Sequence, residues 1–532
     1  MLKLFFKTCP KSGRIRGIRQ DTIFHKIFFP LVGLAALVWV IIRVIPKPSR
    51  ATYPCQQAAI PVATDFLAWL VATSFGVMFI RLSQKYFSRK RLIISSMFAV
   101  IGIFIVVGAH FIYNSDNANA QNSIVTKFTS EKPNQPIGIA KGIFPGRVTW
   151  IRDTTATPWD GKGLWWTDEA INQKAVDNMI AQSIKALTGQ KTEENAWKAA
   201  FKYFNKTHGR KQTDYDKSES IVIKINLNNS FEQNDPNNNQ ANASSQTILA
   251  LLKQLVYKAG VPQNKITLVD AIRVIPDRIY NPCHQAFPEV NWVDGKGTNG
   301  RIKNVWYNNA FKYAVKNEGT TDIPMCIKNA TYMINMPLLK GHEFSGVTLA
   351  AKNQYGSIAN RDHTKYLKTW LASKPQFSTL VDLMATKELD GKTMLFIMDG
   401  LFANISNVLD NNKTNCAFNH LFNGQWCSSI MMSFDGVAFD SVCLDFLVSE
   451  FGAHLGQVSS TDTRTPVNHC DWYLHEAALI GNPPSGTVYM PDGVKLTSLG
   501  VHEHWNNPID KQYSRNLKTG NGIDLMKVSP LK

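Results

Sequence analysis

Three long apolar runs lie within the first 115 residues, and they constrain this chain more than any other feature. We expect them to form transmembrane helices over residues 27–45, 64–80 and 92–113. Each run is close to the roughly 20 residues that a helix needs to cross the hydrocarbon core of a bilayer. Three such runs separated by basic loops are not typical of helices buried in a soluble core. The sequence therefore predicts a membrane anchor over residues 1–114, with the lipid bilayer as a partner.

The basic residues of this anchor predict its orientation. Before Asn114, 15 Lys and Arg residues are accompanied only by Asp21 and Asp65. They concentrate before the first run and between Arg81 and Arg91, and positive loops stay on the cytoplasmic side. We therefore expect a cytoplasmic N-terminus and a periplasmic or extracellular main domain, most simply in a bacterial inner membrane.

The charge pattern also argues against nucleic acid as a partner. The net charge of the chain is +18, but most of the excess lies in the anchor. Basic residues beside apolar spans are typical of membrane topology and not of a surface that binds phosphate backbones. We expect no nucleic-acid binding.

The rest of the chain reads as a linker and one large domain. Residues 115–136 are polar, rich in Asn and Ser, and lack periodicity, which is typical of a linker. Residues 137–532 then alternate between helix-like and strand-like patterns. We predict an α/β fold with a mostly parallel, helix-covered sheet, preceded by an N-terminal bundle of three transmembrane helices.

A strand–helix–strand unit is the clearest part of this domain. Residues 221–227 are β-branched, Ser245 can cap a helix that ends at Gly260, and residues 266–269 form the next apolar run. Further strands are predicted over 332–336 and 394–398, and a helix over 437–451 closed by Gly452.

Unusual polar residues fall near the ends of these strands. Ligands of open α/β sheets bind outside the carboxyl ends of the strands, so we expect these residues to share one pocket. Lysines and amides there could hold an anion, and aspartates could carry a hard divalent metal. The candidate catalytic residues are Lys224, Lys340, His342 and Lys352, the ligand-binding residues Asn226 and Asn353, and the metal ligands Asp399, Asp435 and Asp440.

Each candidate also has a plain structural interpretation. Lys224 could lie at a strand edge with its amine in water, and Asp435 could simply cap the following helix. His342 could be an ordinary loop histidine, in the segment that follows residue 336. Their joint placement favours function, because independent structural explanations would have to recur several times.

Other motifs bear on cofactors. No C-x-x-C pair occurs, so no iron–sulfur cluster is expected, and Gly295, Gly297 and Gly300 precede a strand-like run, so no dinucleotide site is expected. Cys416 and Cys427 flank a short loop in a compartment where disulfides persist, and we predict a bridge. His502 and His504 could share a metal, but they lack a third ligand in the sequence.

Four of these segments resemble the family called domain of unknown function 362. They are IVIKINLNN, INMPLLKGHEFSGVTLAAKNQYGSI, LFIMDGL and SFDGVAFDSV, between residues 221 and 452. The tail from Ser498 to Leu525 is similar to that of exported members, which makes residues 453–532 a C-terminal extension. Some members carry ferredoxin-type clusters, whose cysteines this chain lacks. The resemblance implies that the polar residues belong together, and it implies no reaction.

Three functions remain open from the sequence. The first is a membrane-anchored extracytoplasmic enzyme that acts on an anionic or carbonyl-bearing ligand, with or without a divalent metal, and uses His342 as acid or base. The second is a ligand-binding or envelope assembly module that uses the same pocket without turnover. The third is a purely structural polar core.

Overall fold

The computed structural model describes residues 132–531, apart from 212, 229, 316–318, 360–366, 368–374, 453–454 and 457–469, together with scattered short stretches of residues 6–100. The chain forms two compact units, 1–125 and 126–532. In the first, β1 (Phe6–Thr8) pairs antiparallel with β2 (Ile15–Ile18). The predicted spans 27–45, 64–80 and 92–113 and the predicted linker lie largely outside the described residues. Among the helices that are described, none combines the length and the apolar character needed to span a bilayer.

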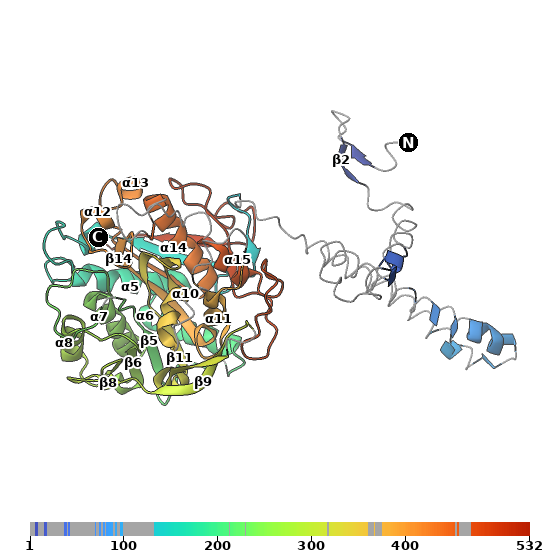
Figure 1. Ribbon diagram of the computed structural model, residues 1–532, viewed down its shortest axis with the longest axis horizontal. Helices are drawn as coiled ribbons and strands as arrows, with labels where there is room; N and C mark the ends of the chain where they lie inside the picture. The colour runs from blue at the N-terminus through green and yellow to red at the C-terminus, as the bar shows by residue number, and fades with distance from the viewer. Residues whose placement is uncertain are drawn as a thin grey trace. The chain divides into compact units, whose positions relative to one another are not determined.

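The second unit is built on one mixed sheet flanked by helices (Figure 1). In the order of their pairing its strands are β17 (Asp524–Val528), β4 (Arg147–Arg152), β15 (Ser429–Ser433), β14 (Thr393–Asn404), β11 (Tyr332–Asn335), β5 (Ile221–Lys224), β6 (Ile266–Asp270), β7 (Asn291–Asp294) and β8 (Ile302–Lys303). From β14 to β8 all neighbours are parallel, and β15 runs antiparallel to both β14 and β4. The predicted α/β class is therefore confirmed.

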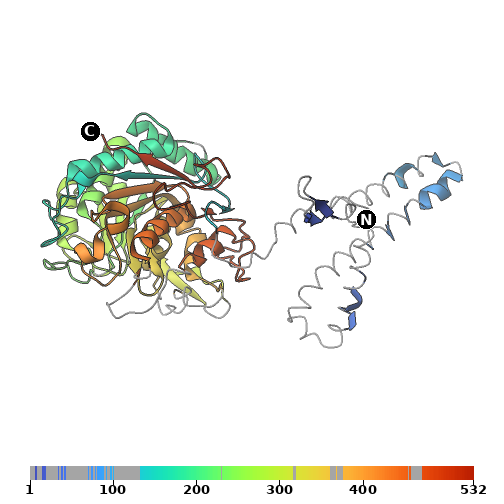
Figure 2. The same cartoon turned by 90° about the horizontal axis from the view of Figure 1, so that it is seen from above.

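Helices cover both faces of the sheet (Figure 2). One face carries α5 (Gln173–Thr188), α6 (Glu193–Thr207), α7 (Ser245–Lys253) and α8 (Asp277–Ala286), and the other carries α10 (Ala350–Asn353), α11 (Thr379–Ala385), α14 (Gly436–Phe451) and α15 (Trp472–Ala478). Successive side chains of β5 alternate between the two cores: Ile221 and Ile223 pack against the first layer and Val222 against the second. This alternation is why the strand reads as a continuous apolar run.

The predicted helices form, with one shifted cap. The N-cap of α7 is Ser244, whose hydroxyl accepts a hydrogen bond from the Thr247 amide, and not Ser245 as predicted. After Lys253 the helix continues as a π-helical turn to Lys258. The helix α14 begins and ends as the sequence indicates, between its N-cap Asp435 and Gly452.

The segment after β11 differs from the prediction. The sequence indicates a loop for the segment that contains His342, but Lys340 and His342 lie on a strand, β12 (Leu338–His342). This strand pairs parallel with β14 and antiparallel with β13 (Gly346–Thr348). The glycine and proline residues of this stretch are typical of a loop, but here they belong to a tight hairpin. Lys340 and His342, two residues apart, therefore project from the same face of one strand.

The predicted disulfide is wrong. Cys416, at the end of α12 (Lys413–Cys416), and Cys427 are both buried free thiols. Cys416 packs in the core that holds α5 and α7, and Cys427 in the core that holds α14. Their side chains thus face different layers, which spacing in the sequence could not show.

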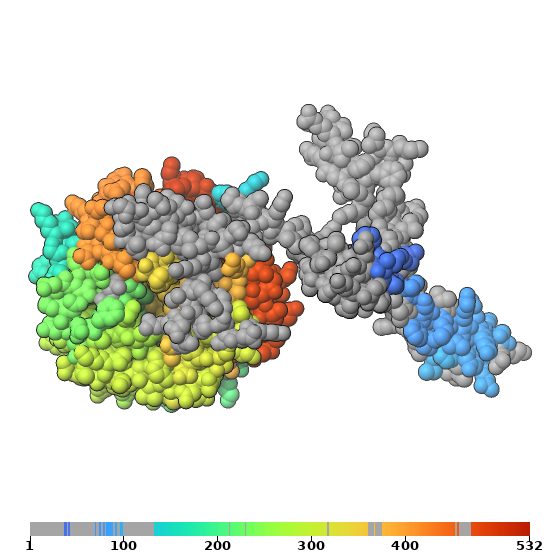
Figure 3. All heavy atoms as spheres, in the orientation of Figure 1, coloured from blue at the N-terminus to red at the C-terminus, as the bar shows by residue number. Residues whose placement is uncertain are grey.

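Within the described part of the second unit, two small strand pairs lie outside the main sheet. The pair β9 (Trp306–Lys312) and β10 (Thr320–Pro324) is antiparallel and lies at the surface, within the yellow-green region along the bottom of Figure 3. The pair β3 (Ile137–Gly138) and β16 (Val501–His502) joins the start of the domain to its C-terminal extension.

Candidate active site

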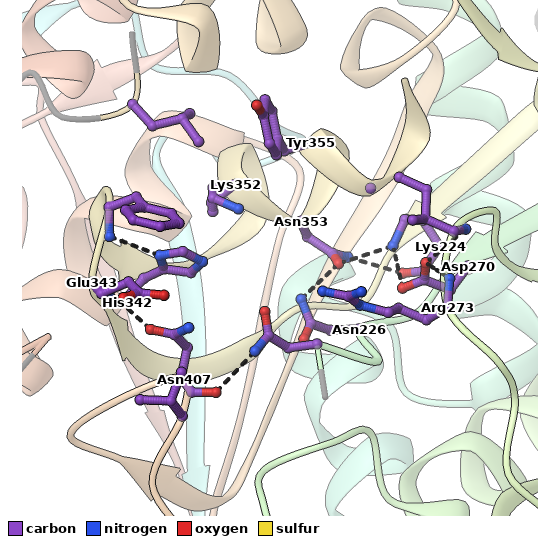
Figure 4. A pocket seen from close by; sticks show the side chains of 16 residues that line it. Lys224, Asn226, Asp270, Arg273, His342, Glu343, Lys352, Asn353, Tyr355 and Asn407 are labelled. Carbon is purple, nitrogen blue, oxygen red and sulfur yellow. Dashed lines mark hydrogen bonds and ion pairs between the residues drawn. The ribbon is translucent and has the colours of Figure 1, made fainter. Parts of the chain in front are cut away.

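One pocket of about 380 Å³ lies where the carboxyl ends of β5 and β6 meet β12 and α10 (Figure 4). Because β5 and β6 are parallel and in register, they deliver Lys224 and Asp270 to one edge. The hairpin β12–β13 adds His342, and the short helix α10 adds Lys352 and Asn353. The remaining lining residues are Asn226, Asn228, Ile272, Arg273, Glu343, Phe344, Tyr355, Gly356, Leu367, Asn407 and Val408.

Lys224 forms the most densely bonded corner of the pocket. Its Nζ donates to the carbonyl oxygen of Ile225 at 2.5 Å and to Asp270 Oδ2 and Asn353 Oδ1, both at 3.2 Å. Burial lowers the pKa of Lys224, while the Asp270 carboxylate acts in the opposite direction. A Cβ on Gly356 would lie 3.1 Å from this amine, so the absence of a side chain there gives Lys224 its space.

The two asparagines are held in fixed orientations. Asn353 Oδ1 accepts from Lys224, so it is the amide oxygen, and the group that Asn226 presents to it at 3.0 Å must be the Nδ2 donor. Asn226 Oδ1 is buried and has no hydrogen-bond partner among the described residues. The pocket therefore contains an unfilled acceptor, which costs free energy unless a ligand donates to it.

His342 lies across the pocket from Lys224, with its ring beside Lys352 (Figure 4). Its Nδ1 lies 3.0 Å from the backbone amide of Phe344, which can only donate, so Nδ1 accepts and Nε2 carries the proton. Burial and the charge of Lys352 hold the pKa of His342 well below its ordinary value. The imidazole is thus neutral and offers an N–H donor.

Two further cations line the pocket. Lys352 Nζ lies 4.6 Å from the ring centre of Tyr355, and the guanidinium of Arg273 lies 4.4 Å from that of Phe231. The lining contains two acidic residues, Asp270 and Glu343. The carboxylate of Asp270 is paired with Lys224. The pocket is therefore rich in donors and positive charge.

Lys340 lies behind this lining. Its side chain is fully buried, and its Nζ has no hydrogen-bond partner among the described residues. Burial, together with the charges of Lys352 and Arg273, holds the pKa of Lys340 well below its ordinary value. Such surroundings disfavour the charged form of this buried amine.

The three predicted metal ligands do not join this pocket. Asp399 accepts hydrogen bonds from the backbone amide and hydroxyl of Ser244 at 2.9 and 2.7 Å, and so fixes the start of α7. Asp435 caps α14 through the amides of Val437 and Ala438, and it also accepts from the amide of Lys141.

Asp440 has a similar structural position. Its two oxygens accept from the amides of Ala350 and Ala351 at 2.8 and 3.1 Å, and the hydroxyl of Tyr473 donates to it at 2.9 Å. The prediction that all seven charged candidates line one pocket is thus wrong for the three aspartates, and Lys340 lies behind the lining. All three carboxylates accept hydrogen bonds from backbone amides at the start of a helix. For Asp435 this is the structural interpretation that the sequence left open.

The pocket also contains residues that the candidate list omitted. Asp270 is the last residue of β6, Arg273 lies in the loop that follows it, and Glu343 and Asn407 come from the loops after β12 and β14. The same rule that selected Lys224, a polar residue at the carboxyl end of a strand, applies to Asp270 and Arg273. Asn407 had no comparable signal, because the sequence placed the end of β14 about six residues too early.

Comparison with known proteins gives one family. Residues 221–445 match the model of the family described as Domain of unknown function (DUF362). The match includes every lining residue of the pocket. A comparison with curated proteins finds no match to this chain.

Proposed function

We propose that this pocket, inside the segment that matches the DUF362 family, is the active site of an enzyme that acts on a small anionic or carbonyl-bearing ligand. One observation carries the proposal: Lys224, Arg273, Lys352 and a neutral His342 surround a cavity in which Asn226 Oδ1 is an unfilled acceptor. This combination specifies an anion that also carries a hydrogen-bond donor.

The roles of the lining residues follow from their chemistry. Arg273 and Lys352 supply the charge that a carboxylate or phosphate requires, and an arginine can bind either group through two parallel hydrogen bonds. His342 Nε2 donates to a carbonyl or an oxyanion, since its proton is fixed by the Phe344 amide. Asn226 Oδ1 accepts from a hydroxyl or amine of the ligand. Lys224 and Asp270 neutralise each other and hold Asn353 in place.

Lys340 distinguishes an enzyme from a binding module. An uncharged amine can remove a proton or attack a carbonyl, whereas a charged lysine can only attract an anion. Lys340 and His342 project from one face of β12, so the amine lies beside the group that would polarise the ligand. A module that only captured an anion would gain nothing from a lysine that lies behind the lining and whose charged form is disfavoured by burial.

We further propose that a membrane anchor holds this domain outside the cytoplasm. The support is the pattern of apolar runs and basic loops in residues 1–114. An envelope assembly module would share this anchor, so the location does not decide between catalysis and binding.

The test is a binding and turnover screen on the full-length protein in detergent. Small carboxylates and phosphate monoesters, with and without hydroxyl groups, are titrated calorimetrically into the wild type, Arg273→Met and Lys352→Met. Exposed Lys495, which lies outside the pocket, provides the matched control Lys495→Met.

We expect binding that prefers hydroxylated anions and weakens about 10- to 100-fold in the two pocket variants, because each removes a charged hydrogen-bond donor. Equal binding by the pocket variants and the control would refute the site. Binding without conversion of any bound compound would favour the assembly module.

A further inference from the structure

A second cluster of polar groups lies away from the pocket, between α15 and β16. It consists of Asp471, which precedes α15, His475 one turn later, and His502 at the end of β16. One ligand atom from each of these three residues lies within 4.8 Å of the other two. We propose that they form a binding site for a divalent transition metal of the zinc class.

The tautomer of each histidine is fixed in the form that such a site requires. His475 Nδ1 lies 3.1 Å from the carbonyl oxygen of Asp471, which can only accept, so Nδ1 carries the proton. A neutral imidazole protonated at Nδ1 has its lone pair at Nε2. The metal-binding lone pair of His475 is therefore at Nε2.

His502 is fixed through a different partner. The hydroxyl of Ser441 donates to the carbonyl oxygen of Val437 at 2.7 Å, so toward His502 Nδ1, at 2.8 Å, the Ser441 oxygen acts as acceptor. His502 Nδ1 must then donate, and its lone pair also lies at Nε2. Hydrogen bonds of this kind from the second ring nitrogen are the usual support of metal-ligating histidines.

The carboxylate of Asp471 has one oxygen committed and one available. Its Oδ2 lies 3.4 Å from His504 Nε2, and the same ring contacts Asp445 Oδ1 through Nδ1 at 2.6 Å. Oδ1 of Asp471 is buried and has no hydrogen-bond partner among the described residues. A buried carboxylate oxygen without a partner is unfavourable, and a cation supplies what it lacks.

The set of ligands selects the metal. Two imidazoles and one carboxylate suit zinc, and a site with three protein ligands retains a position for water or another ligand. His475 and His502 are buried, while the side chains of Asp471 and His504 keep about a fifth of their surface exposed, 19% and 24%. The site is therefore dry on the side of the histidines and accessible beside Asp471.

The experiment uses the full-length protein, purified in detergent through a tag without histidines and dialysed against a chelator. Co²⁺ is the probe, because its visible absorption reports nitrogen and oxygen ligands in a tetrahedral field, and Zn²⁺ is then used to displace it. We expect one Co²⁺ per chain, removed by one equivalent of Zn²⁺. A titration without a visible band, or without a defined stoichiometry, overturns the proposal.

Variants assign the ligands. His475→Gln and His502→Gln should each weaken Co²⁺ binding more than 100-fold, and Ser441→Ala about 10-fold, since loss of a supporting hydrogen bond costs 10- to 100-fold. The matched control is His420→Gln, an exposed histidine elsewhere. Equal losses in the control and the ligand variants would overturn the assignment.

X-ray absorption of the Zn²⁺-loaded wild type keeps the test independent of whether the variants fold. Two imidazoles should scatter at about 2.0 Å. A zinc shell without histidine would refute the proposal.

Discussion

Lys224 lines the pocket and Lys340 lies behind its lining, and both side chains are fully buried. Lys224 Nζ lies 3.2 Å from Asp270 Oδ2, whereas Lys340 Nζ has no hydrogen-bond partner among the described residues. The two amines therefore have opposite energetic characters. Lys224 is one half of a buried ion pair, and its removal leaves a charge behind. Lys340 is an isolated polar group, and its removal leaves nothing uncompensated.

This difference predicts opposite effects of the same substitution. Lys340→Met should raise the free energy of unfolding by about 1–3 kcal/mol, the cost of an unsatisfied buried group, and should abolish turnover. Lys224→Met should lower the free energy of unfolding by about 3 kcal/mol, because Asp270 stays buried without its partner. Urea denaturation of both variants measures the two signs. A loss of stability in Lys340→Met would show that its amine has a partner.

Because His342 is neutral, its contribution to ligand binding should not depend on pH between pH 6 and 8. Since the pKa of His342 lies well below its ordinary value, the ring does not titrate between pH 6 and 8. His342→Leu should weaken ligand binding about 10- to 100-fold through loss of the Nε2 donor, by the same factor at both pH values. Calorimetry at pH 6 and 8 gives the ratio. A ratio that rises toward pH 6 would mean that the protonated ring binds the ligand.

Asp440 should make the folded domain more stable in mild acid. Burial raises the pKa of Asp440 to about 7, while an unfolded aspartate titrates near 3.8. Between these two pKa values the folded state binds more protons than the unfolded state. The contribution of Asp440 to the free energy of unfolding is therefore complete below about pH 4 and is lost as the pH rises through 7.

Asp440→Asn removes this titration. We expect a smaller fall in the free energy of unfolding between pH 5 and pH 7.5 than in the wild type, although Asp435, with a pKa raised to about 6, still adds to the fall. Urea denaturation at the two pH values tests this. An unchanged pH dependence would show that Asp440 is ionised throughout.

The proposed topology can be tested in intact cells. In a chain with Cys55→Ser and Cys326→Ser, a membrane-impermeant maleimide should label a cysteine placed at Ser123 but not one placed at Ser83, since Cys326 is only partly buried. The reason is the cytoplasmic preference of the basic residues between Arg81 and Arg91. Labelling after permeabilisation is the control for access to both positions. The reverse pattern would contradict the orientation.

Part of the site could be predicted from the sequence because strand ends can be located. Lys224, Asn226 and Asn353 were selected by this rule, and they do meet in the pocket. The partner of Lys224 also lies at a strand end, Asp270. The sequence did not show that Lys224 and Asp270, which are far apart in the chain, form an ion pair.

The aspartates show where such reasoning stops. A carboxylate that caps a helix and one that binds a metal share the same signal, a polar residue next to an apolar run. Asp435 and Asp440 became acceptors for backbone amides, which no residue pattern records. Conversely, the sequence shows no third metal ligand near His502. His475 and Asp471 are about 30 residues away in the chain and become close only when α15 packs beside β16.

The strand β17 has a consequence for how the protein is made. One outer edge of the sheet is formed by residues 524–528, which pair with β4 near the start of the domain. During synthesis this side of β4 stays unpaired until β17 has left the ribosome. A truncation before residue 524 would expose the edge of β4, and exposed strand edges recruit other chains. Synthesis of β17 therefore protects the nascent domain from aggregation.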